Sequence, residues 1–262
     1  MSYQDRFSGI ARLYGQQALE GFRQTKVTIV GIGGVGSWAA EAMLRTGFEH
    51  ITLIDMDDIC VTNSNRQIHT GKSTIGQLKV EAMAKRLQDI NPEAKITPIM
   101  DFLTQTNLEQ YLSEQDYVID AIDSVKVKAA LIAHCKRHKI PLVTTGAAGG
   151  QTDPTQITVG DLNKTYNDPL AKKVRSLLRR DYGFSRNTKR TYGVPCVFST
   201  EQLKYPQPDG SVCQNKHFDD GVVKMDCAGG FGASTMVTAS FGFVAAAEAA
   251  KRLAKKYTEK NK

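Results

Sequence analysis

Paired cysteines are what this sequence most plainly lacks. Its cysteines are odd in number and widely spaced over 262 residues, and no Cys-x-x-Cys pair occurs among them. A structural zinc site is usually built from such pairs, and disulfide frameworks are typical of short, cysteine-dense secreted chains. We therefore expect neither a structural zinc ion nor a disulfide-based fold. The cysteines are Cys60, Cys135, Cys196, Cys213 and Cys227.

The start of the chain also lacks an apolar targeting segment, because residues 1–6 read Met-Ser-Tyr-Gln-Asp-Arg. A secretory signal needs an apolar region near the N-terminus, so we expect a cytoplasmic protein. One uncharged stretch, residues 227–247, is nominally long enough to span a bilayer. Small residues dominate it and give it a weak preference for lipid, so we expect a buried helix over residues 233–256 instead.

Positive charge is unevenly distributed along the chain. Lysine and arginine number 34 against 27 acidic residues, a net charge of +7. Residues 162–190 contain nine basic and two acidic side chains, which accounts for the whole excess. A localised basic excess favours a polyanionic partner such as nucleic acid, and the alternative is a solvated basic face. The apolar fraction of 41% excludes a disordered or fibrous chain.

Short β-branched runs alternate with helical patterns through the first 150 residues. Such alternation predicts an α/β fold with a doubly wound, mainly parallel, Rossmann-like sheet. After residue 150 the pattern changes to a strand at 155–160, a basic helix at 168–181 and a loop-rich stretch at 183–230, so we expect an elaborated C-terminal part. The earlier predicted strands are 26–31, 50–55, 94–100, 117–123 and 141–145, and the predicted helices are 35–45, 76–90, 105–114 and 125–138.

A glycine-rich turn joins the first predicted strand to the first predicted helix. It reads Gly31-Ile-Gly33-Gly34-Val-Gly36, and Asp55 follows 19 residues later at the end of the second strand. Glycines in this position let backbone N–H groups approach phosphate, and an acidic residue at this distance accepts ribose hydroxyls. The strand–turn–helix context therefore predicts a nucleotide site.

The residues after this turn decide between two nucleotides. The first alternative is the dinucleotide cofactor of a dehydrogenase, but these residues favour ATP. Arg66 and Lys79 would stabilise charge that builds on phosphates when a triphosphate is cleaved. Asp123, just after the fourth strand, would hold Mg²⁺ at the edge where ligands bind. Each residue alone also fits a surface or capping role, but Asn63, Arg66, Gln67, Lys79 and Asp123 together predict an ATP site.

This set of motifs resembles the ubiquitin-activating-enzyme-like adenylyltransferases over about residues 6–160. The resemblance implies that Asp55 binds the ribose, that Asn63, Arg66 and Lys79 contact phosphates, and that Asp123 holds Mg²⁺. It also implies a homodimer in which Arg6 or Arg12 reaches the partner's site. The zinc-binding cysteine pairs common in relatives that activate sulfur carriers are missing. The ATP-binding set implied is Gly31, Gly33, Gly34, Gly36, Asp55, Asp57, Asn63, Arg66, Gln67 and Lys79, with Arg66, Lys79 and Asp123 catalytic.

The second half resembles one branch of that superfamily, the tRNA threonylcarbamoyladenosine dehydratases. The segments that carry this resemblance are the basic helix 172–180 and residues 181–186, 194–201 and 229–232. The branch implies ATP-dependent cyclisation of N6-threonylcarbamoyladenosine at tRNA position 37 through an acyl-adenylate. It also suggests a cysteine desulfurase or sulfur-acceptor partner. The implied tRNA contacts are Lys172, Lys173, Arg175, Arg179, Arg180, Arg186, Lys189 and Arg190.

Two other functions stay open at this point. An adenylyltransferase that activates the C-terminus of a sulfur-carrier protein would need a reactive thiol, for which Cys196, Cys213 and Cys227 are candidates, although we expect inert thiols. A non-catalytic RNA-binding module would need only the basic segment. We expect residues 1–150 to form an ATP-binding part, and residues 151–262 to complete the same domain with the basic tRNA-binding region (162–190) and a terminal helix.

Overall fold

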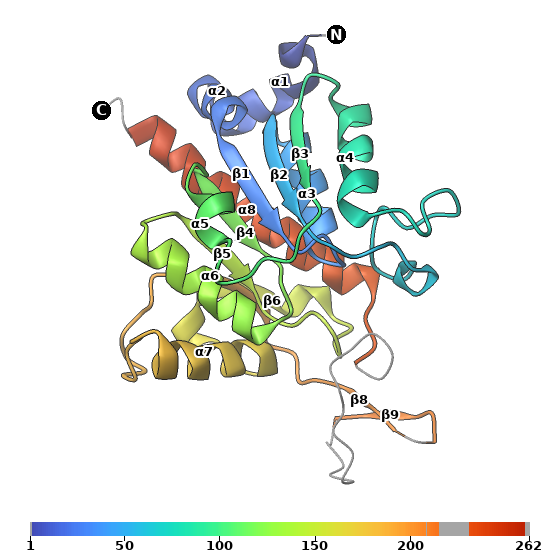
Figure 1. The fold of residues 1–262 in the computed structure, drawn as a ribbon, viewed down its shortest axis with the longest axis vertical. Helices are drawn as coiled ribbons and strands as arrows, with labels where there is room; N and C mark the ends of the chain where they lie inside the picture. Colours follow the sequence, from blue (N-terminus) through green and yellow to red (C-terminus); the bar gives the residue numbers. More distant parts are fainter. Residues whose placement is uncertain (1, 208, 215–230, 260–262) are drawn as a thin grey trace.

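A seven-stranded sheet forms the centre of the computed structural model, which describes residues 2–207, 209–214 and 231–259 (Figure 1). All neighbouring strands are parallel except β6 and β7. The predicted doubly wound, mainly parallel sheet is therefore confirmed. The strand order is β3 (Lys95–Ile99), β2 (His50–Ile54), β1 (Lys26–Val30), β4 (Tyr117–Asp120), β5 (Leu142–Thr145), β7 (Pro195–Ser199) and β6 (Ile157–Asp161).

Helices cover both faces of the sheet because successive side chains of each strand point to opposite faces. In β4, Tyr117 and Ile119 join one apolar cluster, and Val118 joins the other. The first cluster includes residues of α2 (Gln16–Gln24), α3 (Gly36–Arg45), α4 (Lys79–Ile90) and α8 (Thr235–Glu259), and the second includes residues of α5 (Leu108–Leu112), α6 (Val125–Arg137) and α7 (Pro169–Asp181).

The terminal helix α8 runs along the first of these faces (Figure 1). It packs against α2 and α3 and crosses β4, β5, β7 and β6. Its buried side chains include Val237, Phe241, Ala245 and Ala249. The predicted buried helix over 233–256 is thus confirmed, while residues 227–230 of the uncharged stretch lie outside the described part. Within the described residues, no helix is long and apolar enough to cross a membrane.

Several described elements are not predicted by the sequence patterns, among them α1 (Tyr3–Tyr14), α2 and β7. A signal for α1 is present, because Ser2 Oγ accepts from Asp5 N while Ser2 N donates to Asp5 Oδ2, a capping box. The strand β7 is a five-residue run, Pro-Cys-Val-Phe-Ser, inside the stretch predicted as loop-rich, and runs that short carry no distinct periodicity. A small hairpin, β8 (Tyr205–Pro206) and β9 (Val212–Cys213), follows it.

Candidate functional site

A cavity of about 650 Å³ opens at the carboxyl edge of the sheet, beside the ends of β1, β2, β4 and β5. The strand order reverses between β1 and β4, and doubly wound sheets bind ligands in the crevice at such a point. Two of the residues predicted to bind ATP, Gly36 and Asn63, are not among its lining residues. The predicted residues that line it are Gly31, Gly33, Gly34, Asp55, Asp57, Arg66, Gln67, Lys79 and Asp123.

The turn between β1 and α3 requires glycine at two positions. Gly31 has a φ of +85°, and a Cβ there would lie 2.8 Å from the Ala121 carbonyl oxygen. A Cβ on Gly36 would lie 1.8 Å from the Gly31 carbonyl oxygen. These close approaches let α3 begin directly against the end of β1. Gly36 therefore serves the turn itself, while Gly33 and Gly34 line the cavity.

Asp55 ties this turn to the end of β2. Its Oδ2 accepts a hydrogen bond from Ile32 N at 2.6 Å, and its Oδ1 accepts one from Asp57 N at 2.9 Å. Burial raises the pKa of Asp55, although the nearby Lys79 ammonium opposes that shift. Each carboxylate oxygen has a second lone pair, so Asp55 keeps the capacity to accept ribose hydroxyls.

Lys79 is the first residue of α4, and its side chain is only 8% exposed. Its Nζ donates to Asp57 Oδ2 at 2.6 Å, and both residues line the cavity. The backbone repeats this contact, because Lys79 N donates to Asp57 O at 3.0 Å. The ammonium is thus held in place at the start of α4, where a phosphate would also be favoured by the helix N-terminus.

The loop before α4 brings Arg66 and Gln67 to the cavity. Arg66 Nη1 donates to Thr62 O at 3.0 Å and to Asn65 Oδ1 at 2.8 Å. Gln67 Oε1 is buried and has no hydrogen-bond partner among the described residues, as expected of an acceptor that a ligand would satisfy. Asn63 instead holds the loop together, since its Oδ1 accepts from Cys60 N at 2.9 Å.

Asp123 lies in the turn between β4 and α6. Its side chain is exposed and lines the cavity. Arg66 and Lys79 line the same cavity from the opposite side of the strand-order reversal. A single carboxylate facing a phosphate site is a typical Mg²⁺ ligand, because Mg²⁺ combines one or two carboxylates with phosphate oxygens and water. The donor set around the cavity therefore fits a magnesium-bound triphosphate.

A buried ion pair beneath this turn is a feature that the sequence reading missed. Lys128 Nζ lies 2.8 Å from Asp120 Oδ2 and 3.1 Å from Thr144 Oγ1, and the Thr144 hydroxyl donates to Asp120 Oδ2 at 2.6 Å. Asp120 Oδ1 accepts from Ile122 N at 3.1 Å. The sequence carries a signal for this pair. Asp120 lies in an otherwise apolar strand, and eight positions later Lys128 is followed by alanines and a leucine.

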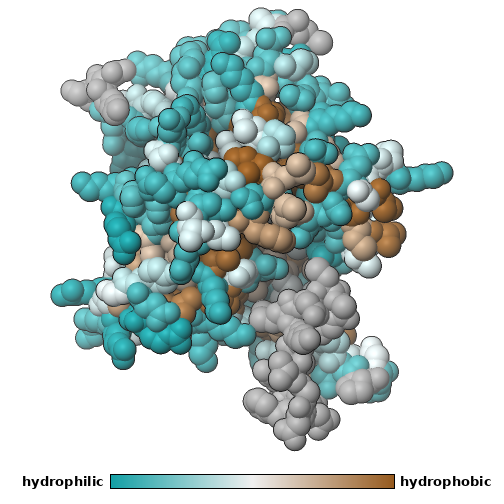
Figure 2. All heavy atoms as spheres, in the orientation of Figure 1, coloured by the Kyte–Doolittle hydropathy of each residue, from teal (hydrophilic) through white to brown (hydrophobic). Residues whose placement is uncertain are grey.

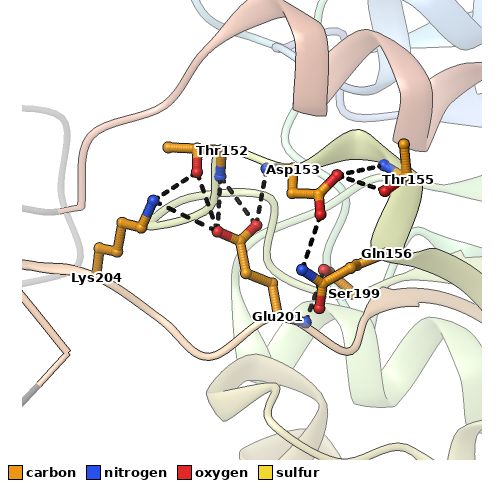
Figure 3. Close-up of polar contacts among 7 residues, drawn as sticks. All are labelled: Thr152, Asp153, Thr155, Gln156, Ser199, Glu201 and Lys204. Atoms are coloured by element: carbon orange, nitrogen blue, oxygen red, sulfur yellow. Dashed lines mark hydrogen bonds and ion pairs between the residues drawn. The ribbon is translucent and has the colours of Figure 1, made fainter.

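Glu201 fixes the loop that follows the cavity-lining residues 145–149 (Figure 3). Its carboxylate accepts from the backbone N–H groups of Thr152 and Asp153, each at 2.9 Å, and from the Thr152 hydroxyl at 3.1 Å. Although burial would raise it, these donors hold the pKa of Glu201 below its usual value. Lys204 Nζ lies 3.7 Å from the same carboxylate. Residues 145–149, which line the cavity, are thereby anchored to the end of β7.

The predicted tRNA contacts fall into two groups. Arg175 donates to Thr165 Oγ1, and Arg179 donates to Tyr192 Oη at 2.9 Å and to Asn163 Oδ1 at 2.7 Å, so these two arginines bind their own chain. Arg180 is exposed and pairs with Asp181 at 2.7 Å. The remaining five are exposed: Lys172, Lys173, Arg186, Lys189 and Arg190. Hydrophilic surface covers the region of α6 and α7, whereas apolar surface gathers across the middle of the same face (Figure 2).

Two of the three candidate thiols are described, and neither lines the cavity. Cys196 is buried in β7, and burial raises its pKa, which disfavours the nucleophilic thiolate. Cys213 is partly exposed in β9. Cys227 lies outside the described residues. Near the N-terminus, Arg6 Nη1 donates to Ile90 O at 2.8 Å within its own chain, whereas Arg12 is exposed.

Comparison with known proteins decides the family, since the model of the ThiF family matches residues 7–262. The chain belongs to the ThiF family. It is 59% identical to the tRNA threonylcarbamoyladenosine dehydratase of Escherichia coli (strain K12), over 96% of this chain and 94% of that protein. It is 52% identical to the Haemophilus influenzae dehydratase, over 97% and 95%. The resemblance to the dehydratase branch is thus confirmed.

The fold of this ThiF-family chain matches a crystal structure of the E. coli tRNA N6-threonylcarbamoyladenosine dehydratase in complex with ATP. The TM-score is 0.87 at 54% identity, with 98% of this chain and 96% of that chain covered. Because 98% of this chain is covered, the match includes β6, β7 and α8 as well as β1 to β5.

Replacing Lys128 by methionine should destabilise the protein by about 3–5 kcal/mol, because it leaves the fully buried Asp120 carboxylate without its cation. Urea unfolding followed by circular dichroism measures the change. Lys126→Met, an exposed position of the same helix, is the matched control and should change the free energy of unfolding by less than about 0.5 kcal/mol. Equal effects of the two substitutions would contradict the role of the ion pair.

His69 makes the stability of the glycine turn dependent on pH. Its Nε2 lies 2.9 Å from the Ile32 carbonyl oxygen and must donate to it, and burial lowers the pKa of the ring from 6.5 to about 4. The unfolded chain therefore takes up a proton near pH 6.5, and the native state only near pH 4. The free energy of unfolding is therefore unaffected by this histidine above pH 6.5 and decreases as the pH falls toward 4. About 2 kcal/mol is lost by about pH 5.

His69→Gln, which still has a donor for Ile32 O, should remove this part of the pH dependence. Urea unfolding at about pH 7.5 and about pH 5 gives the free energy of unfolding that each protein loses between the two pH values. The loss in the wild type minus the loss in the variant is the contribution of His69. Parallel losses in the two proteins would show that His69 does not titrate as its burial requires.

Proposed function

We propose that this protein is an ATP-dependent tRNA threonylcarbamoyladenosine dehydratase, which cyclises N6-threonylcarbamoyladenosine at position 37 of tRNA. The observation that carries the proposal is the cavity with its glycine turn, Asp55, Arg66 and Lys79, in a chain that matches dehydratases over nearly its whole length. That full-length match favours dehydration over activation of a sulfur-carrier protein. A buried Cys196 with a raised pKa also argues against a thiol-transfer mechanism at that position.

The chemistry explains why ATP is needed. The free carboxylate of the threonylcarbamoyl group is a poor electrophile, because its oxygen is a bad leaving group. Attack of that oxygen on the α-phosphorus breaks the bond to the β-phosphate, giving an acyl-adenylate and pyrophosphate. A neighbouring atom of the same group then attacks the activated carbonyl, loses its proton and expels AMP. Ring closure is intramolecular, so it benefits from a high effective concentration.

The residues around the cavity have distinct roles in this proposal. Asp55 binds the ribose, and the turn at Gly33 and Gly34 lies against the phosphates. Arg66 and Lys79 stabilise negative charge that develops on the phosphates during the attack. Asp123 would hold Mg²⁺, which supplies further positive charge to the phosphate oxygens when bound. Asp57 positions Lys79 through their ion pair, and Gln67 offers a buried acceptor to the nucleotide.

The basic segment is the proposed contact surface for tRNA phosphates. Since Arg175 and Arg179 bind their own chain, the exposed side chains carry most of this role: Lys172, Lys173, Arg180, Arg186, Lys189 and Arg190. In this arrangement residues 1–150 supply most of the nucleotide site, and residues 151–262 complete the domain and bind tRNA. The later part also contributes cavity-lining residues, namely Leu170, Phe231, Gly232, Ala233 and Thr238. A cytoplasmic location and a cysteine desulfurase or sulfur-acceptor partner complete the proposal.

A homodimer is also part of the proposal, as the family resemblance implies. Arg6 is engaged with Ile90 in its own chain, whereas Arg12 is exposed at the end of α1. Arg12 is therefore the better candidate to reach the nucleotide of a second copy.

Incubation with ATP, Mg²⁺ and tRNA carrying N6-threonylcarbamoyladenosine should lower the mass of that nucleoside by one water. Asp123→Asn should slow both this change and pyrophosphate release by roughly 100-fold or more, the scale of removing one electrostatic stabiliser. Asp89→Asn, an exposed position of α4, is the matched control. Nucleoside mass spectrometry is the measurement, and an unchanged nucleoside with the wild-type protein would refute dehydration.

Neutralising Lys189 and Arg190 together by glutamine should flatten the dependence of tRNA affinity on salt. Each lost phosphate contact lowers the slope of log affinity against log salt by about 0.7–0.9. The double control Lys85→Gln/Lys95→Gln removes the same charge from α4 and β3, and ATP binding should not change in either variant. Equal slopes in all three proteins would show that the basic segment is a solvated surface that does not contact tRNA phosphates.

A further inference from the structure

Three metal-ligating side chains gather at the end of α6 that lies away from the nucleotide cavity. His134 lies in the last turn of α6, His138 is its C-cap residue, and Glu109 lies in α5. One nitrogen of each histidine and a carboxylate oxygen of Glu109 all lie within 4.8 Å of one another. None of the three lines the cavity, and the proposed dehydration uses none of them.

The geometry of the cluster is that of ligands and not of a hydrogen-bonded pair. His134 Nε2 lies 3.6 Å from Glu109 Oε2, and His138 Nδ1 lies 3.5 Å from the same oxygen. Good hydrogen bonds between these atoms are about 2.7–3.2 Å long. Two ligand atoms that each bind zinc at about 2.0–2.1 Å in a tetrahedral site lie about 3.4 Å apart. The two nitrogen–oxygen separations are therefore close to the edge of a coordination tetrahedron, and the two nitrogens lie within 4.8 Å of each other.

The surroundings support the same conclusion. His134 Nε2 is buried and has no hydrogen-bond partner within the described part of the chain, which is costly for a ring nitrogen unless a ligand satisfies it. The two imidazole rings are stacked, with centroids 4.2 Å apart and planes 15° apart. Because an ion lies in the plane of each imidazole that binds it, binding requires the rings to turn about their broad χ2 torsions. The side chains of His138 and Glu109 are 42% and 63% exposed, which leaves a path for an ion from solvent.

We propose that Glu109, His134 and His138 bind one divalent transition-metal ion of the zinc class, with water in the remaining position. Two imidazoles and one carboxylate suit Zn²⁺, Ni²⁺ or Cu²⁺, whereas Mg²⁺ and Ca²⁺ prefer oxygen ligands alone. Because the ligands come from two helices, a bound ion would join the short helix α5 to the C-terminus of α6. The ion would stabilise that corner of the fold without taking part in nucleotide chemistry.

Titration of tag-free, chelator-treated protein with ZnCl₂ by isothermal calorimetry tests the proposal. We expect one saturable ion per chain and a zinc-dependent rise in the unfolding temperature. Glu109→Gln and His138→Asn change exposed residues and should fold normally, yet each should weaken zinc binding by more than about tenfold, the scale of losing even a supporting group around a metal.

Control variants separate this site from other zinc-binding groups. His50→Gln removes a histidine of β2, and Cys60→Ser removes the exposed thiol. Both should keep the bound ion and the thermal shift, and dehydration of tRNA by Glu109→Gln should equal that of the wild type. Absence of saturable zinc binding, or binding that survives both Glu109→Gln and His138→Asn, would overturn the proposal.

Discussion

The ion pair between Asp120 and Lys128 is the contact on which the arrangement of the site most depends. Both side chains are almost fully buried, so neither charge is screened and each needs the other. Asp120 also accepts from Ile122 N and from the Thr144 hydroxyl, which links the end of β4 to β5. The turn that carries Asp123 therefore starts from a fixed point, next to Gly31 of the opposite half.

The sheet and the glycine turn could be predicted because their signals are local. A β-branched run such as Val27–Val30 marks a buried strand, and the glycine spacing marks the turn that follows it. Even the role of Gly36 follows from a local rule, since the third glycine of such turns allows close packing of helix and strand. The short strand β7 escaped prediction because three apolar residues after a proline resemble a loop as much as a strand.

Contacts between distant side chains could not be predicted in the same way. Lys79 was expected to face phosphates, but only the folded chain brings it to Asp57, 22 residues away in sequence. Arg175 and Arg179 were predicted to belong to the basic surface. The number of charges in a segment does not distinguish an arginine that hydrogen-bonds to its own chain from one that faces solvent. Partner choice of this kind depends on tertiary geometry, which a one-dimensional pattern does not contain.

The position of α8 has a consequence for the order in which the protein becomes functional during synthesis. This last helix packs against α3, the first helix after the glycine turn, and Thr238 approaches Gly34 within the same cavity wall. Gly34 and Thr238 are 204 positions apart in the sequence, so their contact closes a very long loop. A nascent chain that has completed the first five strands still leaves this face of α3 uncovered. The wall of the cavity is therefore complete only once α8 has been synthesised and has packed onto α3.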